Sequence, residues 1–326
     1  QPFPVNISIT HPGIDVSVNG DIAQVLDGEG LSLTTQVASE DLTLLADILP
    51  PNWPILGKLT AEGVVSGAID QFRLTEVYLS YTDNDNATVF IAGDIDAPLL
   101  GKGLVLDVDA SVGLASDIAA FVLADHVPAL LLKQGRVDIQ GQIAGSVAHP
   151  ILQNALIRVD DDAGGSIRVS GMAEDLINGT GLGLDYDIAL AAASPLLKLL
   201  NLKQFSLDKI DLTGTARGSL TTLATTVSKM TFKHRGGANG VANGKIIFRD
   251  GHPNDGFFDV KGYAQNLSDL NVLTGLELQQ TASVNLSAHV SVEQGQFSLK
   301  SSETHIDGHQ SGSPRAATIK AHGSLG

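Results

Sequence analysis

The stretch LVLDVDASV, residues 104–112, alternates between apolar and polar side chains from Leu106 onward. Leu104 and Leu106 belong to the apolar set, whereas Asp107 and Asp109 belong to the polar set. Because successive side chains of a β-strand point to opposite faces of a sheet, the alternation predicts a strand with one apolar face and one acidic, solvated face. LGLDYDIAL, residues 182–190, repeats the same pattern.

Strands of this kind recur along the chain. A strand that ends in glycine returns at intervals of 73, 78, 73 and 79 residues. Each of the first four copies is followed by a second strand, a helix-like segment and two further strands, which predicts a repeat array of mainly β structure. No unit of about 75 residues buries its apolar face alone, so the whole chain, 1–326, is expected to form one array. The recurring glycines are Gly20, Gly93, Gly171, Gly244 and Gly323, and the units are approximately 1–93, 94–171, 172–244 and 245–323.

Each unit is expected to contain one short helix. Serine is a favoured N-cap residue, and one serine stands near the start of each helix-like segment. Pro195 also fits the first position of a helix. The expected caps are Ser39, Ser116, Ser194 and Ser268, which open the segments 39–49, 116–127, 194–200 and 268–276.

The strand after the first three helices carries two glycines four residues apart. In KLTAEGVVSG, residues 58–67, the alternation places Gly63 and Gly67 on the apolar face. A glycine there marks a bend or a close approach by another group, so we expect room above the sheet for the crossing helix or for a lipid tail. The side chains expected to line this apolar face are Leu59, Ala61, Gly63, Val65, Leu104, Leu106, Val108, Val137, Ile139, Gly141, Ile143, Leu182, Leu184, Tyr186, Ile188, Ile210, Leu212 and Gly214.

Composition narrows the function classes. Hydrophobic residues make up 43% of the chain, charged residues 17%, and the 35 glycines suit many strands and tight turns. A net charge of −16 disfavours nucleic acid and anionic membrane surfaces as partners. The chain has no cysteine, which fits either the periplasm or the cytoplasm. It opens on Gln1 without the pattern of a signal peptide, and we interpret it as a fragment of a longer chain or a mature chain.

The order of these motifs resembles a known family. LTTQVASEDLTLLADILPPNWPILGKLTAEGVVSG, within residues 29–95, is similar to the repeat of the AsmA-like proteins of Gram-negative bacteria, which are related to TamB-type and other bridge-like lipid-transfer proteins. Weaker copies cover the rest of the chain. The resemblance implies a periplasmic sheet that curls into an apolar groove for phospholipid tails. It also implies an inner-membrane anchor outside this sequence, and partners at the inner and outer membranes.

The sequence contains only weak candidates for metal-binding or catalytic motifs. His305 and His309 lie four apart in what the composition predicts to be a polar loop, where metal geometry would not be fixed. The runs 83–86 and 160–162 could supply oxygen ligands for calcium, but Asx-rich hairpin turns explain them more simply. The acidic pairs at 107/109 and 185/187 lie on the wet face and not in a shaped, desolvated site. We therefore expect no catalysis, cofactor or metal.

The apolar face leaves two alternatives. One is a closed core of a structural or adhesin-like β-repeat protein that has no lipid ligand. The other is an elongated, open groove whose lining is completed by the acyl chains of phospholipid or another lipid. Aromatic residues make up only 5% of the chain, and an aliphatic lining suits flexible chains better than one rigid ligand.

Overall fold

The protein is mainly β. The computed structural model describes residues 2–45, 57–83, 87–113, 135–161, 164–191, 208–234, 237–270, 282–310 and 313–324, and these contain strands and three short 3-10 helices. Contacts divide the chain into two compact units, which are described separately. The first comprises residues 1–124, 134–159 and 171–180, and the second comprises 125–133, 160–170 and 181–326.

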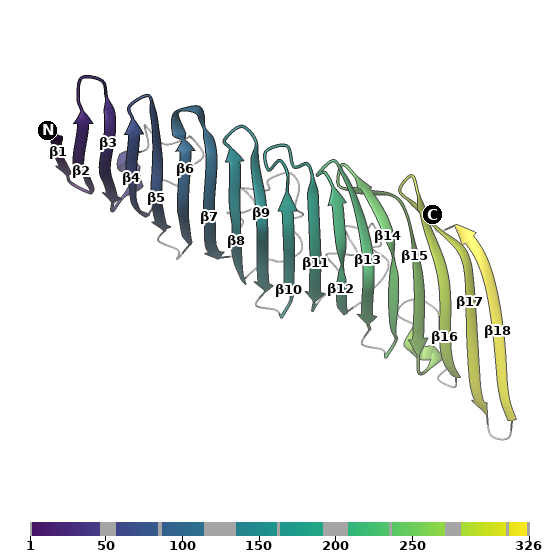
Figure 1. Ribbon diagram of the computed structural model, residues 1–326. Coiled ribbons are helices and arrows are strands. Elements are labelled where there is room, and N and C mark those ends of the chain that lie inside the picture. The colour runs from purple at the N-terminus through teal and green to yellow at the C-terminus, as the bar shows by residue number, and fades with distance from the viewer. Residues whose placement is uncertain are drawn as a thin grey trace. The chain divides into compact units, whose positions relative to one another are not determined.

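The first unit is an antiparallel meander. Each strand from β1 to β7 pairs with the next one along the chain, as Figure 1 shows. Short turns make this order possible, because antiparallel neighbours need only a hairpin to connect them. Its strands are β1 (Phe3–His11), β2 (Ile14–Gln24), β3 (Glu29–Ser39), β4 (Lys58–Ala68), β5 (Gln71–Thr82), β6 (Thr88–Ala97), β7 (Lys102–Gly113), β8 (Gly135–Ser146) and β9 (Pro150–Asp161), and the 3-10 helices η1 (Leu42–Leu45) and η2 (Pro98–Leu100) lie between strands.

The second unit follows the same plan. From β11 to β18, each strand again pairs antiparallel with its successor. The division between the two units passes through β10 (Ser166–Ala173). The strands are β11 (Leu182–Leu190), β12 (Lys209–Gly218), β13 (Thr222–Lys233), β14 (Asn239–Arg249), β15 (His252–Ala264), β16 (Ala282–Glu293), β17 (Gln296–Gln310) and β18 (Ser313–Ser324), with η3 (Leu267–Leu270) after β15.

The recurring glycines lie inside strands and do not end them, contrary to the prediction. β2 continues to Gln24 beyond Gly20, and β6 continues to Ala97 beyond Gly93. Gly20 and Gly93 have φ angles of +149° and +148°, a conformation that other residues rarely adopt. The strand can continue because glycine lacks the Cβ that would otherwise meet the neighbouring strand.

The helix prediction needs correction at its caps. Ser39 is the last residue of β3, and the cap of η1 is Asp41, whose Oδ1 accepts a hydrogen bond from the Thr43 backbone N–H at 2.9 Å. This bond also lowers the pKa of the Asp41 carboxyl. Ser268 lies within η3, which already begins at Leu267. The segments 116–127 and 194–200, with their expected caps Ser116 and Ser194 and with Pro195, lie outside the described residues.

Candidate functional site: the apolar face

One face of the first unit is apolar from strand to strand. In an antiparallel pair, residues directly opposite each other project from the same face. Starting at β1, one row of such partners crosses eight strands without a polar side chain. The row is Ile9, Val16, Val37, Ala61, Leu79, Ile91, Val108 and Gly141.

The predicted lining residues of this unit all lie on that face. The β3–β4 and β7–β8 registers align Leu33 with Val65 and Leu106 with Ile143, so that the aliphatic side chains of neighbouring strands meet. Most of these side chains are half-buried, and several near the strand ends are buried. The set comprises Leu59, Ala61, Gly63 and Val65 of β4, Leu104, Leu106 and Val108 of β7, and Val137, Ile139, Gly141 and Ile143 of β8.

The second unit has an apolar face of the same kind. A row of partners from β11 to β16 is apolar throughout, and it ends at Ser302 of β17. The row is Ile188, Leu212, Met230, Ala242, Val260, Ala288 and Ser302. The predicted lining residues Leu182, Leu184, Tyr186 and Ile188 of β11, and Ile210, Leu212 and Gly214 of β12, lie on this face.

Polar atoms on the apolar faces are bonded to the backbone. The Thr35 hydroxyl donates to the Gly63 carbonyl at 3.1 Å, and the Tyr186 hydroxyl donates to the Thr226 carbonyl at 3.1 Å. Burial raises the pKa of Tyr186 to about 12. Among the described residues, no buried side-chain nitrogen or oxygen lacks a partner. The faces therefore offer an aliphatic surface with few polar groups to satisfy.

The space above the paired glycines differs between strands. A Cβ placed at Gly214 would lie 2.4 Å from the Tyr186 hydroxyl, so the tyrosine ring occupies that space. At Gly63 the nearest described atoms lie 3.6 Å away, in Thr75 and Val77 of the neighbouring strand. The expected room is thus filled by an aromatic side chain in one case. At Gly63, an added Cβ would make only ordinary van der Waals contact with the described neighbours.

Helical residues cover one end of each face. Leu42 of η1 is fully buried against Leu59 and Tyr81, near the start of β4 and the end of β5. In the second unit, Leu267 of η3 packs against a cluster that contains Ala264 and Val284. Both contacts lie at strand ends, so these helical residues anchor the edge of the face.

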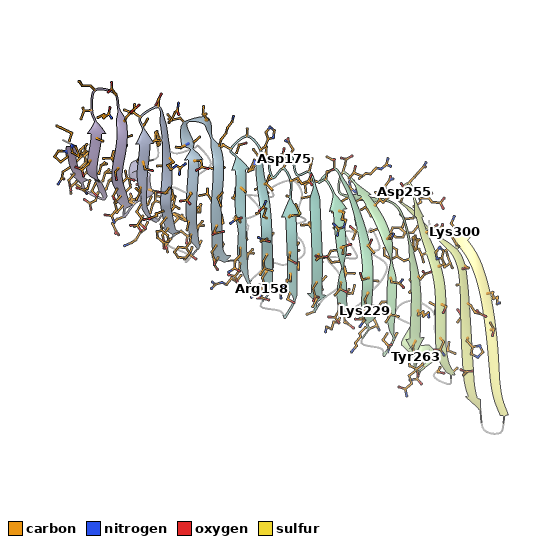
Figure 2. All side chains as sticks on the ribbon, viewed as in Figure 1. Arg158, Asp175, Lys229, Asp255, Tyr263 and Lys300 are labelled. Carbon is orange, nitrogen blue, oxygen red and sulfur yellow. The ribbon has the colours of Figure 1, made fainter. Side chains whose placement is uncertain are left out.

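The opposite face of the first unit, called the polar face, carries mostly polar side chains, with the exposed Tyr78 and Phe90 among them. Gln142 and Gln140 donate to Asp107 and Asp109, each at 3.0 Å, across the β7–β8 pair. A shallow hollow opens beside these side chains and Phe90. Figure 2 shows side chains standing on both sides of the strands.

The metal candidates do not form a cluster. SSETHIDGHQ, residues 301–310, is part of strand β17 and not the predicted loop, because residues 301–308 pair antiparallel with β16. His305 contacts Thr318 at 3.0 Å and Asp307 at 3.3 Å, whereas the His309 side chain lies outside the described residues. Asp83 instead forms a turn, since its carboxylate accepts from the Ala87 N–H at 2.7 Å.

The described residues contain neither a metal-ligand cluster nor a membrane-spanning helix. No group of three or more His, Cys, Asp or Glu could hold a metal ion there, and no helix among them is long and apolar enough to cross a membrane. Residues 84–86 and Asp162, which belong to the calcium candidates, lie outside that part of the chain. No protein-family model, curated protein or solved structure matches this chain.

Proposed function

We propose that the apolar faces bind the acyl chains of phospholipid and carry them in a lipid-transport system of the AsmA-like type. The mechanism is passive and needs no catalytic residue, metal or cofactor. Aliphatic side chains remove lipid tails from water, and each Å² of apolar area covered contributes about 25 cal/mol.

The continuous apolar register carries this proposal. The row from Ile9 to Gly141 crosses eight strands, and its members come from separate hairpins. A closed pocket for one rigid ligand would need a few convergent polar groups, whereas a flexible chain needs only length and apolar character. A long row of Val, Ile, Leu, Ala and Gly supplies both.

The resemblance to AsmA-like proteins adds a sheet shape, a cellular location and partners to the proposal. The sheet would be elongated and curled into a groove, with one short helix for each repeat of about 75 residues. It would lie in the periplasm, anchored to the inner membrane by a segment outside the given sequence, and it would exchange lipid with partners at both membranes. The acidic face would keep the exterior solvated.

Site-specific photocrosslinking tests the proposal on the folded chain. A photoreactive amino acid at Leu106 would lie on the apolar face, and one at Val105 would lie on the polar face of the same strand. After purification from cells, irradiation is expected to attach phospholipid at position 106 and not at position 105. Mass spectrometry of the crosslinked peptide identifies the lipid.

A matched measurement separates the two functional alternatives. Native mass spectrometry of the unmodified protein should find co-purified phospholipid. A lipid-free protein that also gives equal, background crosslinking at both positions would favour the closed core of a structural β-repeat protein.

A further inference from the structure

The hairpin turns along one edge of the first unit expose large aliphatic side chains. β2–β3, β4–β5, β6–β7, β8–β9 and β10–β11 all turn at this edge (Figure 1). Leu26 is fully exposed, and Leu100 is 71% exposed. We call this set the turn rim: Val25, Leu26, Ile69, Leu99, Leu100, Val147, Leu176 and Ile177.

The opposite edge differs. The described turn residues there include Pro12, Gly13 and Asp83, and none of the described residues in those turns is an exposed large apolar side chain. Scattered exposed leucines are normal on a protein surface, but eight aliphatic side chains on five consecutive turns form a pattern that points to a partner.

Hydrogen bonds between the turns hold the rim together. The Ile69 N–H donates to the Gly28 carbonyl at 2.9 Å, and the Val147 N–H donates to the Gly101 carbonyl at 2.8 Å. In both pairs the aliphatic side chain lies directly over the glycine of the neighbouring turn. These bonds join the turns in pairs, 25–28 with 69–70 and 98–101 with 147–149, so the turns of each pair are held against each other.

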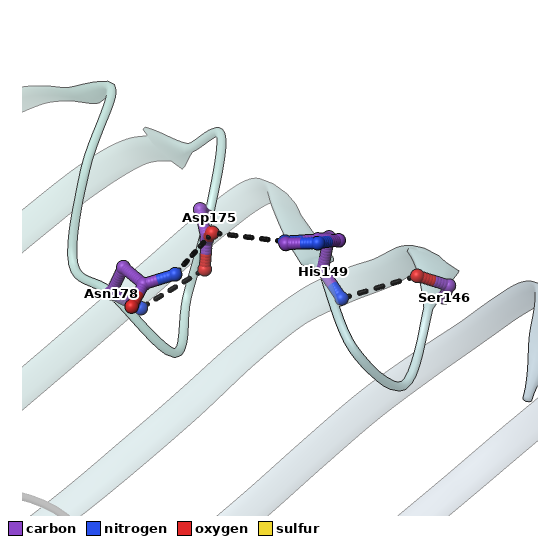
Figure 3. Close-up of polar contacts among 4 residues, drawn as sticks. All are labelled: Ser146, His149, Asp175 and Asn178. Carbon is purple, nitrogen blue, oxygen red and sulfur yellow. Dashed lines mark hydrogen bonds and ion pairs between the residues drawn. The ribbon is translucent and has the colours of Figure 1, made fainter.

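The same kind of link joins the last two turns. Figure 3 shows His149 of the β8–β9 turn beside Asp175 of the β10–β11 turn, with the His149 Nδ1 and an Asp175 carboxylate oxygen 3.3 Å apart. Asn178 donates to Asp175 through its backbone N–H at 3.0 Å and its side chain at 2.7 Å. The Leu176 N–H also donates to the Pro150 carbonyl at 2.8 Å. These contacts fix Leu176 beside the β8–β9 turn.

Acidic residues flank the turn rim. Asp27, Glu29, Asp70 and Glu174 are exposed next to its aliphatic side chains, together with one exposed lysine, Lys102, so the flanking charge is net negative. They would face the phosphates of a bilayer or the same carboxylates of a second copy, and both contacts are repulsive. A partner that presents apolar side chains flanked by lysine or arginine would be complementary.

The spacing of the turns selects the partner's shape. Adjacent strands lie about 4.8 Å apart, so successive hairpins repeat about every 9.5 Å. Seven residues of an α-helix rise about 10.5 Å, which brings equivalent side chains to nearly the same interval. Five turns span about 38 Å, the length of a helix of about 25 residues.

From this charge and spacing, we propose that the turn rim is a docking surface for a basic amphipathic helix of a partner protein. The helix places one apolar side chain per heptad between successive turns, and its lysine or arginine side chains face the flanking carboxylates. This site is separate from the apolar faces and does not depend on lipid binding.

A designed peptide tests the docking surface on the whole chain. The probe is a labelled helix of about 25 residues with leucine at heptad a and d positions and lysine elsewhere on the flanks. Controls are a scrambled peptide of the same composition and a peptide with glutamate in place of lysine. Fluorescence anisotropy should give at least about tenfold tighter binding of the lysine helix than of either control.

Two variants locate the binding. The double variant Leu26→Gln, Leu100→Gln should weaken binding of the lysine helix at least about tenfold, without changing the circular dichroism spectrum, because both side chains are exposed. Val105→Thr, an exposed valine away from the turns, should leave the affinity unchanged. Equal binding of the scrambled peptide, or unchanged binding by the double variant, would overturn the proposal.

Two other occupants of the turn rim, a lipid bilayer and a second copy of this chain, would each give a different experimental result. Sedimentation with phosphatidylcholine vesicles that requires Leu26 would assign the rim to a bilayer instead. Self-association that requires Leu26, measured by analytical ultracentrifugation, would assign it to a second copy. Either result contradicts a helical partner, whereas absence of lipid from the purified protein has no bearing on it.

Discussion

Substitution of Gly93 by alanine should destabilise the first unit strongly. Gly93 has φ +148°, and a Cβ at this position would lie 2.0 Å from the Val105 carbonyl oxygen and 3.0 Å from the Leu106 Cα. Relief of this overlap requires β7 to move by about 1 Å or Gly93 to leave its conformation. Either change disrupts the β6–β7 pairing.

The expected loss follows from two contributions. A residue held in a backbone conformation that only glycine favours costs of order 1–3 kcal/mol. Loss of one ladder hydrogen bond adds about 1 kcal/mol. We expect Gly93→Ala to lower the free energy of unfolding by about 3 kcal/mol, which corresponds to roughly 10 °C in melting temperature for a cooperative unit of about 150 to 250 residues.

Thermal unfolding followed by circular dichroism measures this loss, and Gly113→Ala is the matched control. Gly113 ends β7, has no described heavy atom within 4 Å of its would-be Cβ, and does not have a positive φ. Its substitution should change stability by less than about 1 kcal/mol. Gly20→Ala should behave like Gly93→Ala, since its Cβ would lie 2.0 Å from the Ser32 carbonyl oxygen. If Gly93→Ala and Gly113→Ala melt at the same temperature, the reasoning is wrong.

Three further predictions concern charge and burial. Burial raises the pKa of Tyr186 to about 12, so the protein should lose stability as the pH rises from about 10 to about 12, where the unfolded chain ionises first. Tyr186→Phe should reduce this loss in urea titrations, and the raised pKa of Tyr81 accounts for part of the remainder. Hydrogen bonds from the backbone and side chain of Asn178 lower the Asp175 pKa from its ordinary value of 3.8 to about 2. The Asn178 amide should therefore stay protected against hydrogen exchange at pH values above 3.8 and lose this protection as the pH falls through about 2. Asp175→Asn should remove this transition. Val108→Lys buries a charge on the apolar face and should destabilise by at least about 2 kcal/mol in denaturant unfolding, whereas Val105→Lys, on the polar face of the same strand, should change stability by less than about 0.5 kcal/mol.

The strands and their faces could be predicted from the sequence because alternation is a local property. The set at 104–112 places Leu106 and Val108 on one face and Asp107 on the other, and pairing with β8 keeps that order. Any register shift by one residue would exchange the two faces, so the apolar pattern itself selects the pairing. The predicted lining could therefore be named before the partners were known.

Features that depend on exact geometry could not be predicted in the same way. The end of β3 at Ser39 moves the helix cap to Asp41, and a serine and an aspartate two residues apart are equally good caps by type. β5 contains a bulge, with Glu76 at φ +52°. The polar composition around His305 predicts a loop, and only the pairing of this segment with β16 makes it a strand.

The turn rim has a signal in the sequence, but a weak one. VLDG at 25–28 and PLLG at 98–101 place aliphatic residues inside turns, where polar residues are the norm. One such turn carries little information. Only the hairpin order, which brings turns at 25–28, 69–70 and 98–101 to one edge, makes the pattern visible.

The distribution of burial along the strands bears on the choice between a closed core and a lipid trough. Leu104 and Leu59 are each 8% exposed and lie near opposite edges of the first unit. Leu33, Val65 and Leu106, in the middle of the same face, are only half-buried. A closed core would bury its middle most deeply, because edges are nearest to solvent. Among the described residues, Gly63 is buried in the middle of β4, but the half-buried side chains leave a strip across successive strands, which is the direction in which the acyl chain of the proposed function would extend.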